Sequence, residues 1–450
     1  MTRRGPETSN PPVVSARRGA ERALLVQLRL DNRRDATEDL EELRLLAQSA
    51  GAEVRGAVAG SRDKPDSATF VGKGKAEEIR ARAAAERIDV VLLNHALTPS
   101  QERNLEKAVG CRVLDRTGLI LDIFAQRARS REGQLQVELA QLEHLSTRLV
   151  RGWTHLERQK GGIGLRGPGE TQLEVDRRLI RDRIKKLHER LAQVTQQRRS
   201  RRKARDRIPI PTASLVGYTN AGKSALFNRL TGAGVYTADQ LFATLDPTMR
   251  RVNLPGNLAV ILADTVGFIR DLPHDLVAAF KSTLEEVAEA ELLLHVVDAA
   301  NAERLDRMQR VNEVLAEIEA SAIPQIVVFN KIDLTGETPR LERDADGRVA
   351  RVWLSALTGE GTDLLLEAVA AHFRTHHRHY HLCLPPEAGR LRALLYERFN
   401  VRRESLPATG GWQLDVTLNP EQLAWLRRQP GFEERFLPAD DTPVLAPTGS

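Results

Sequence analysis

The chain has 450 residues, which is too long for one ordinary hydrophobic core, so several domains are expected. Its hydrophobic content of 41% and charged content of 28% are typical of a globular protein, and no stretch approaches the ~20 apolar residues of a membrane span. Two cysteines, Cys111 and Cys383, exclude a cysteine-built zinc site and argue against a disulfide framework, and we interpret both as small buried apolar residues. Because no apolar run follows the charged N-terminus, we expect a cytoplasmic protein, with peripheral membrane association as an alternative.

The first 130 residues predict a disordered tail and an α/β domain. Residues 1–20 are polar and proline-rich, and from residue 21 to 130 short apolar runs alternate with amphipathic stretches. The predicted strands are ALLVQLRL, ATFVG, DVVLLN and CRVLD, and the predicted helices lie near residues 37–50, 75–86 and 99–109. This alternation is typical of a largely parallel sheet covered by helices.

Residues 131–208 have a different pattern, in which apolar residues recur every seven positions. The first series is Leu135, Leu142, Leu149 and Leu156, with Leu139 and Trp153 between, and the second is Leu173, Ile180, Leu187 and Val194, with Ile184 and Leu191 between. The loop GGIGLRGPG, Gly161–Gly169, breaks the helix, and Thr171 with Glu174 fits a capping box that restarts it. We therefore predict an antiparallel helical hairpin, of coiled-coil type, followed by the basic linker QQRRSRRKARDR.

The net charge of +6 is unevenly distributed. Residues 151–207 contain 18 Lys/Arg against 7 Asp/Glu, so this segment alone carries an excess of 11 positive charges. Such a concentration favours a surface that binds polyanions, although charge runs are more often solvated helix faces.

Residues 209–376 open with the features of a phosphate-binding loop. The strand TASLV, the loop GYTNAGKS and the helix ALFNRL follow one another in the order that such a loop requires. Gly217 and Gly222 let successive backbone amides point at a β-phosphate, Lys223 can neutralise the β- and γ-phosphates, and Ser224 can bind Mg²⁺. Asn220 stands where some GTPases help to coordinate K⁺, or it simply stabilises the loop. The other predicted contacts in this loop are Tyr218, Thr219, Ala221 and Ala225.

Two further segments have the pattern of nucleotide switches. In DTVGF, Asp264 can hold Mg²⁺ through water and the Gly267 amide can contact a γ-phosphate. In LFATLDPT, Thr244 can close over the Mg²⁺, although it could be an ordinary loop threonine. Phe268 occupies the position where many small GTPases have a water-orienting Gln, which predicts slow intrinsic turnover. We assign catalysis to Lys223, Thr244 and Gly267, and nucleotide contacts also to Phe242, Ala243, Thr265 and Val266.

The strand PQIVVF leads into NKID, a pattern that reads guanine. The Asp333 carboxylate can accept both the N1–H and the 2-amino group of guanine, and adenine has an acceptor in place of N1–H. Asn330 and Lys331 can bind the other side and the face of the base, and SAL, Ser355–Leu357, can bring the Ala356 amide to guanine O6. These ordered motifs predict a GTP- and GDP-binding hydrolase that uses Mg²⁺.

The remaining chain predicts a small α+β domain over residues 377–438 and a disordered tail over residues 439–450. An extended HLCL, a helix over 386–397, a strand over 412–418 and a helix over 420–428 are expected. The histidines of THHRHYH could bind a metal, but they lack cysteine or carboxylate neighbours in sequence, so we interpret this segment as a polar linker.

The chain resembles HflX-type GTPases from about residue 21 to 357. The resemblance rests on GKGKAEE, RVLDRTGLILDIFAQRA, LQVELAQLEHL, GGIGLRGPGETQLEVDRR, GYTNAGKS, LFATLDPT, DTVGFIRDLPH and NKID. It implies a GTPase that binds the large ribosomal subunit and helps to split stalled ribosomes under stress, with turnover stimulated by the ribosome. It also implies ATP binding by the N-terminal domain, for which Lys73 and Lys75 are candidates.

The resemblance and the basic segment together predict contacts with ribosomal RNA. The candidate residues are Arg166, Arg198, Arg199, Arg201, Arg202 and Lys203. We expect a monomer without an integral membrane segment. The alternatives are an RNA-remodelling ATPase with a regulatory GTP site, and a signalling GTPase that acts on a protein partner.

Overall fold

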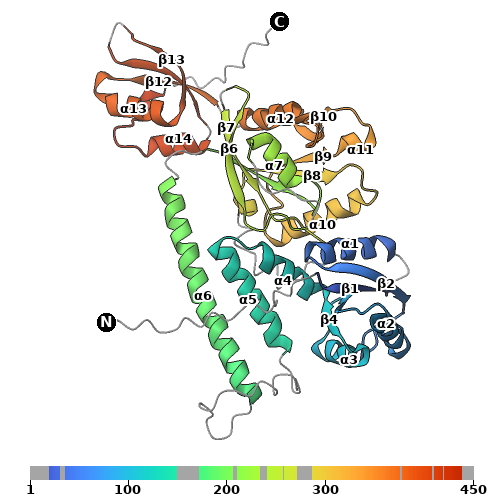
Figure 1. The fold of residues 1–450 in the computed structure, drawn as a ribbon. Helices are drawn as coiled ribbons and strands as arrows, with labels where there is room; N and C mark the ends of the chain where they lie inside the picture. Colours follow the sequence, from blue (N-terminus) through green and yellow to red (C-terminus); the bar gives the residue numbers. More distant parts are fainter. Residues whose placement is uncertain are drawn as a thin grey trace. The chain divides into compact units, whose positions relative to one another are not determined.

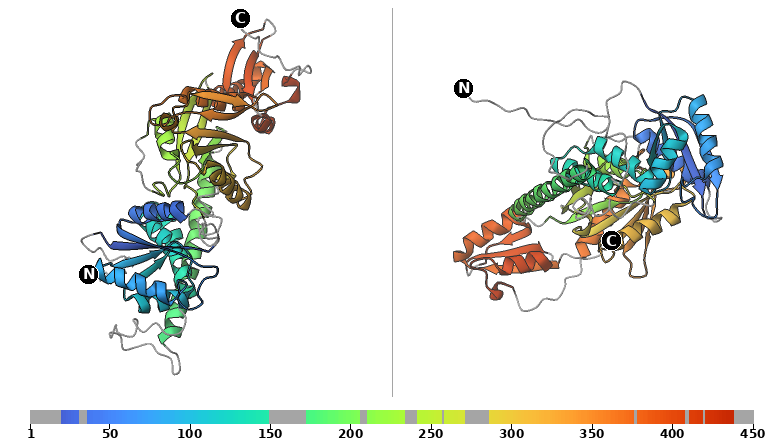
Figure 2. Two further views of the ribbon diagram at one scale, coloured as in Figure 1. Left: turned by 90° about the vertical axis from the view of Figure 1, so that its right-hand side faces the viewer. Right: turned by 90° about the horizontal axis from the view of Figure 1, so that it is seen from below.

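The computed structural model describes most of the chain in two compact units (Figures 1 and 2). The described residues are 20–30, 36–148, 172–205, 210–233, 241–256, 258–270, 286–375, 378–407, 410–418 and 420–437. The first unit comprises Met1–Thr195, Tyr236–Asp246 and Val266–Thr283, and the second comprises Gln196–Val235, Pro247–Thr265 and Leu284–Ser450. Two short segments that the sequence placed in the GTPase domain therefore group with the N-terminal part. Within the described ranges, no helix has the length and apolarity to cross a bilayer.

The first unit contains a four-stranded parallel sheet in the order β2-β1-β3-β4. Its elements are β1 (Arg22–Arg29), α1 (Ala36–Ser49), β2 (Glu53–Ser61), α2 (Lys73–Ala85), β3 (Val90–Leu93), α3 (Pro99–Val109), β4 (Arg112–Asp115) and α4 (Arg116–Arg127). Leu24, Val26 and Leu28 of β1 alternate along one face and share a core with α2 and α3. The predicted α/β architecture is confirmed.

The predicted strand ATFVG is wrong, because residues 68–72 form a turn. The Asp66 carboxylate accepts the backbone N–H groups of Ala68 at 3.0 Å and Thr69 at 2.8 Å, which holds this turn. The strand is instead β2, which pairs with β1 at the end of the sheet. Only one residue of β2 is fully buried, and its sequence EVRGAVAGS lacks the marked apolar run by which the other strands were predicted.

Helices α5 (Arg131–Arg148) and α6 (Gln172–Arg205) form the predicted hairpin (Figure 1). Their contact is built from the predicted heptad residues Leu135, Leu139 and Leu187, packed by Leu142, Ile184, Leu191 and Val194. The basic run is not a linker, because α6 continues through it to Arg205. Leu149, Trp153, Leu156, the Gly161–Gly169 loop and Thr171 of the capping box lie outside the described residues.

The second unit contains a seven-stranded sheet in the order β10-β11-β9-β8-β5-β7-β6. Only the outer pairs β10–β11 and β6–β7 are antiparallel, which confirms the predicted, mainly parallel sheet. Its strands are β5 (Thr212–Val216), β6 (Thr248–Leu254), β7 (Leu258–Asp264), β8 (Leu292–Asp298), β9 (Gln325–Asn330), β10 (Arg340–Arg343) and β11 (Val349–Trp353).

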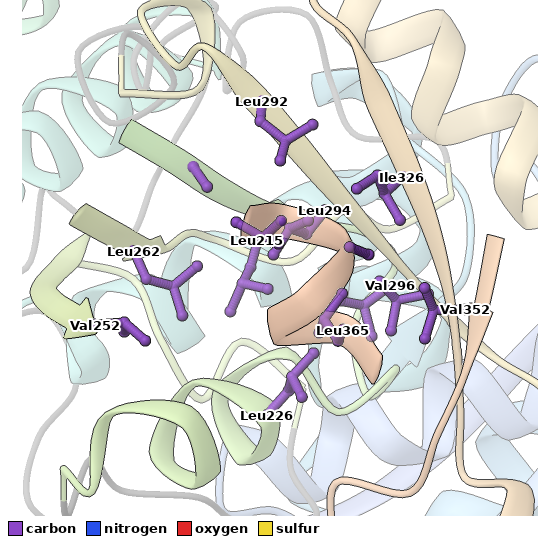
Figure 3. Close-up of a cluster of buried hydrophobic side chains, with 14 of the residues drawn as sticks. Leu215, Leu226, Val252, Leu262, Leu292, Leu294, Val296, Ile326, Val352 and Leu365 are labelled. Carbon is purple, nitrogen blue, oxygen red and sulfur yellow. The ribbon is translucent and has the colours of Figure 1, made fainter. Parts of the chain in front are cut away.

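Helices α7 (Lys223–Thr231), α10 (Arg304–Glu317), α11 (Ile332–Thr335) and α12 (Thr362–Thr375) belong to this sheet domain. Figure 3 shows its core, in which Leu215, Leu294 and Val296 of the central strands lie near Leu365 of α12 and Leu226 of α7. Since β5, β7, β9 and β11 run parallel in one sheet, the loops that follow them lie along one edge. These are the four loops that carry the sequence motifs.

The C-terminal part of this unit is a three-stranded antiparallel sheet in the order β12-β14-β13, with α+β composition as predicted. Its elements are β12 (Arg378–Leu384), α13 (Gly389–Arg398), β13 (Asn400–Ser405), β14 (Trp412–Leu418) and α14 (Pro420–Arg427), with short 3₁₀ turns at Pro386–Ala388 and Glu434–Phe436. Strand β13 was missed from the sequence, and the supposed polar linker is β12 from Arg378 onward. Cys383 is exposed and Cys111 half-buried, so the interpretation of both as buried residues is wrong.

Candidate nucleotide-binding site

The loop between β5 and α7 needs its glycines for steric reasons. Gly217 has φ 147° and a Cβ there would collide with the Val296 carbonyl oxygen. Gly222 has φ 91°, and a Cβ there would collide with the Asn330 amide nitrogen. Asn220 also takes a left-handed conformation, with φ 59°, which Asn tolerates better than most residues. The loop is therefore held in a curled shape, as the phosphate-binding motif predicts.

Lys223 is folded back onto this loop. Its ammonium donates to the carbonyl oxygens of Gly217 at 3.0 Å and Tyr218 at 2.8 Å. Burial lowers the pKa of Lys223 to about 8, and the nearby carboxylate of Asp264 only partly opposes this shift. A buried cation whose charged form is disfavoured gains stabilisation when an anion arrives, so this lysine suits phosphate binding.

Ser224 and Asp264 meet where α7 begins and β7 ends. The Ser224 hydroxyl donates to the Asp264 carboxylate at 2.7 Å, and Asp264 is fully buried. A hydroxyl and a carboxylate provide the oxygen ligands that Mg²⁺ prefers, so this pair of side chains fits a Mg²⁺ site. The neighbouring Thr265 hydroxyl donates to the Leu215 carbonyl at 2.6 Å, so that side chain ties β7 to β5. Its predicted nucleotide contact would involve the backbone.

Asp333, which the sequence predicts to read the base, is oriented by a serine from a different loop. The Ser355 hydroxyl donates to Oδ1 of Asp333 at 2.6 Å and accepts the Thr358 N–H at 3.2 Å. Ser355 is fully buried. The NKID and SAL segments are therefore brought together as predicted, and the Ser355 side chain binds the Asp333 carboxylate.

Asn330 connects three loops. Its amide nitrogen donates to the Ala221 carbonyl of the phosphate loop at 2.9 Å, and its amide oxygen accepts the Ala356 N–H at 2.9 Å. The Ala356 amide, predicted to reach guanine O6, thus contacts Asn330 in this structure. Lys331 has φ 68°, and its ammonium binds the Asp298 carboxylate at 2.8 Å, which fixes its stem beside the loop.

Several contributors were not found from the sequence. Arg229 of α7 donates to the carbonyl oxygens of Ala356 at 3.2 Å and of Leu357, whose side chain is exposed. Arg307 of α10 lies 4.7 Å above the Tyr218 ring, in a cation–π contact with the phosphate loop. Neither arginine belongs to a recognised motif, because its role comes from the fold.

The segments that contain the predicted switch residues Thr244 and Gly267 belong to the first unit. Phe242 has φ 56° and is buried, and its ring meets Phe124 of α4 edge-on at 4.7 Å. Thr244 and Gly267 are also buried, as is Phe268. Ala243 and Val266 are half-buried. The side chain of Phe242 is therefore used for packing within the first unit.

The predicted RNA and ATP residues are only partly described. Arg166 lies outside the described residues, and the side chains of Arg198, Arg199, Arg201, Arg202 and Lys203 are not described, although these five positions lie in α6. Lys73 begins α2, and the Lys75 ammonium binds the Glu78 carboxylate at 2.7 Å and the Ala59 carbonyl at 3.1 Å. The RNA and ATP contacts stay predictions.

Comparison with known proteins identifies GTPases that are similar to this chain. Family models match residues 37–125, described as GTP-binding GTPase N-terminal, residues 127–205, described as GTP-binding GTPase middle region, and residues 212–331, described as 50S ribosome-binding GTPase. The GTPase HflX of Escherichia coli (strain K12) is 55% identical over 399 residues, which cover 88% of this chain and 93% of that protein. The GTPase HflX of Magnetococcus marinus is 48% identical over 436 residues, which cover 95% of this chain and 100% of that protein. A GTP-binding protein from Sulfolobus solfataricus, solved with GDP, is 25% identical, covers 78% of this chain and 98% of that chain, and has a TM-score of 0.43.

Proposed function

Because the chain belongs to the HflX family of GTPases, we propose that it is a nucleotide switch that binds the large ribosomal subunit and helps to split or rescue stalled ribosomes under stress. GTP binding and GTP hydrolysis follow from the family. The ribosome is the proposed partner, and the family model that matches residues 212–331 carries the description of a ribosome-binding GTPase.

The residues of the site have distinct proposed roles in turnover. Lys223 leaves the carbonyls of its own loop and binds the β- and γ-phosphates, while the amides of Gly217–Ser224 surround the β-phosphate. Ser224 and Asp264 would hold Mg²⁺, with Asp264 acting through water, and Thr244 and the Gly267 amide respond to the γ-phosphate. When bound there, Mg²⁺ would supply charge stabilisation for phosphoryl transfer. Asp333, oriented by Ser355, selects guanine.

We expect slow turnover by the isolated protein. Phe268 is buried and apolar, so it has no group that could orient the attacking water. The ribosome is proposed to raise the rate by ordering the switch segments. Rapid hydrolysis by the isolated protein, without any effect of large subunits, would contradict this proposal.

The observation that carries the ribosome proposal is the charge of α6. This single helix of 34 residues contains 13 Lys/Arg against 4 Asp/Glu, and it spans roughly 50 Å at 1.5 Å per residue. Its packing seam on α5 consists of apolar residues, while Arg177, Arg181 and Lys185 are exposed. An extended cationic helix suits contact with an RNA phosphate backbone, and the scarcity of aromatic residues, 4%, argues against base stacking.

Co-sedimentation with purified large subunits tests the proposal. Binding should be stronger with a non-hydrolysable GTP analogue than with GDP, and GTP turnover should rise when large subunits are added. Equal binding with both nucleotides, or no binding with either, would refute a ribosome switch. If nucleotide-dependent capture is then seen with a protein partner, the signalling alternative gains support.

A charge variant makes the test sharper. Replacing Arg198, Arg199, Arg201 and Arg202 by Gln should weaken ribosome binding and reduce its salt dependence, by a slope of about 0.7–0.9 for each phosphate that the protein no longer neutralises. The matched control replaces Arg348 and Arg351, which lie in or beside the β10–β11 hairpin, by Gln. If both variants bind like the parent chain, the α6 arginines form a solvated face and do not bind RNA.

Two finer proposals concern other ligands. ATP binding by the N-terminal unit is tested by equilibrium titration of Lys73→Ala with ATP, while GDP binding serves as the control. K⁺ coordination through Asn220 is tested by comparing turnover in K⁺ and Na⁺. An ATPase with RNA-unwinding activity that survives Lys223→Ala would favour the remodelling alternative.

A further inference from the structure

The Asp246 carboxylate is bound by the segment that starts helix α5. It accepts the backbone N–H groups of Arg129 and Ser130, each at 2.8 Å, and the Ser130 hydroxyl. Ser130 in turn accepts the Gly133 N–H at 2.9 Å, which caps the helix. A Cβ at Gly133 would collide with the same carboxylate. Asp246 thus fits a site that α5 provides through its backbone, its cap and its glycine.

Arg270 is held in the same unit by residues of the N-terminal α/β domain. Its guanidinium pairs with the Asp39 carboxylate of α1, and its backbone carbonyl accepts a hydrogen bond from Arg116 at 2.8 Å. Arg270 and Arg116 are both more than nine-tenths buried. Buried ion pairs are expensive to break once formed, so this arrangement has a defined geometry.

A third interaction holds the other end of the segment that contains Thr244. The backbone N–H of Leu241 donates to the Ser49 hydroxyl, at the end of α1, at 2.8 Å. Leu241, Phe242 and Asp246 therefore bind the N-terminal part of the unit at both ends of the segment that contains Thr244. The backbone of Thr244 has little freedom while both ends are held.

Asp246 and Arg270 each lie close in sequence to a predicted switch residue. Asp246 follows Thr244 by two residues in LFATLDPT, and Arg270 follows Gly267 by three residues in DTVGFIRDLPH. We propose that Asp246 and Arg270 are positioning residues through which the N-terminal α/β domain and the start of α5 hold both switch segments, and that this arrangement favours the GTP form. The proposal rests on the assignment of Thr244 and Gly267 as γ-phosphate-responsive residues, and it does not require ribosome binding.

Linkage makes the proposal quantitative. If the held switch segments favour the GTP form, then removing the Asp246 carboxylate lowers the affinity for a GTP analogue and leaves GDP affinity nearly unchanged. Coupling of the usual strength corresponds to about fivefold or more in the ratio of the two affinities. By reciprocity, the GTP analogue must protect the start of α5 more than GDP does.

The affinities of full-length Asp246→Ala, Asp246→Asn and Ser130→Ala for GDP and for a non-hydrolysable GTP analogue test this. Asp246→Ala should lower the GTP-analogue affinity relative to GDP by about fivefold or more. Asp246→Asn retains an oxygen that can accept the two amides, so it should recover part of the affinity. Asp344→Ala is the matched control, because Asp344 also accepts two backbone amides, at 3.0 and 2.9 Å, but in the β10–β11 hairpin.

Hydrogen exchange of the wild-type protein provides a second measurement that does not depend on a variant. The amides of residues 129–134 should exchange more slowly with the GTP analogue than with GDP. A lower melting temperature of Asp246→Ala with an unchanged affinity ratio would assign Asp246 a purely structural role. Tighter binding of the GTP analogue by Asp246→Ala would show that Asp246 opposes the GTP form, and either result overturns the proposal.

Discussion

Replacing Asp333 by Asn should change which base the protein binds, and the structure determines how. The Ser355 hydroxyl already accepts the Thr358 N–H at 3.2 Å and donates to Asp333 Oδ1 at 2.6 Å. In Asp333→Asn the same hydroxyl needs an acceptor, so the amide oxygen should turn toward Ser355 and the amide nitrogen toward the base. The new side chain then presents one acceptor and one donor in a fixed order.

This order opposes guanine and suits xanthine. Guanine offers two donors, so one of them loses a charge-assisted hydrogen bond, which costs about 1.5–3 kcal/mol, and faces the amide N–H, which adds about 1–3 kcal/mol. A total of about 2.5–6 kcal/mol corresponds to a loss of roughly two to four orders of magnitude in GDP affinity. Xanthine carries a carbonyl in place of the 2-amino group, so the amide nitrogen can donate to it and xanthosine diphosphate should gain affinity.

Equilibrium titrations with fluorescent GDP and xanthosine diphosphate measure both effects. Asp344→Asn, in the distant hairpin turn, is the control for loss of one negative charge. The double variant Asp333→Asn with Ser355→Ala should gain less for xanthosine diphosphate, because the amide is no longer oriented. If Asp333→Asn keeps its GDP affinity within about threefold, or gains nothing for xanthosine diphosphate, then Asp333 does not read the base.

Three further outcomes are expected. Because the pKa of Lys223 is about 8, nucleotide binding at higher pH requires that this side chain takes up a proton. The GDP affinity should therefore fall about tenfold between pH 7 and pH 9. A pH profile of GDP affinity no steeper than that of Lys223→Met would contradict this. Gly222→Ala should lower the free energy of unfolding, measured with urea, by about 3 kcal/mol, because backbone strain and the collision with Asn330 combine. Gly232→Ala is the control: its φ is 65° and the space around it is open, so backbone strain alone should lower the free energy of unfolding by about 1–2 kcal/mol. If Asn220 coordinates K⁺, GTP turnover should fall when Na⁺ replaces K⁺, and equal rates would assign Asn220 to loop geometry.

The phosphate loop, NKID and SAL could be predicted because each depends on a few neighbouring residues and a strand before it. The packing of α5 on α6 could be predicted for a similar reason, since a seven-residue apolar repeat directly specifies a helical seam. Strand β13, NVRRES, escaped because it lies at the end of its sheet and is rich in charged residues. Its register is specified by pairing with β14, which follows only after an intervening loop.

The basic end of α6 was misinterpreted because charge was given more weight than helix propensity. Arg, Lys and Gln are all good helix formers, and the run lacks glycine and proline, so nothing local ends the helix before Arg205. Cys383 was misplaced because its neighbours in β12 alternate: Leu382 and Leu384 point into the core, which leaves Cys383 on the open face. The hydrogen bonds of Asp246 and Arg270 join positions more than 100 residues apart, and no spacing rule could have found them.

Two separate sets of interactions hold the predicted nucleotide-binding loops and the predicted switch segments, so nucleotide binding and switching should respond to different substitutions. Asn330 links Ala221 to Ala356, so the phosphate loop and the base-reading loops form one connected structure within the second unit. In the proposed function, these loops contact features that GDP and GTP share, except for Lys223, which also binds the γ-phosphate. The segments that contain Thr244 and Gly267 are instead held within the first unit, by Asp246 and Arg270. Substitutions in the base-reading part of the first set should therefore weaken both nucleotides alike. Substitutions of Asp246 or Arg270 should change the preference between them, because we propose that these two residues position the segments that respond to the γ-phosphate.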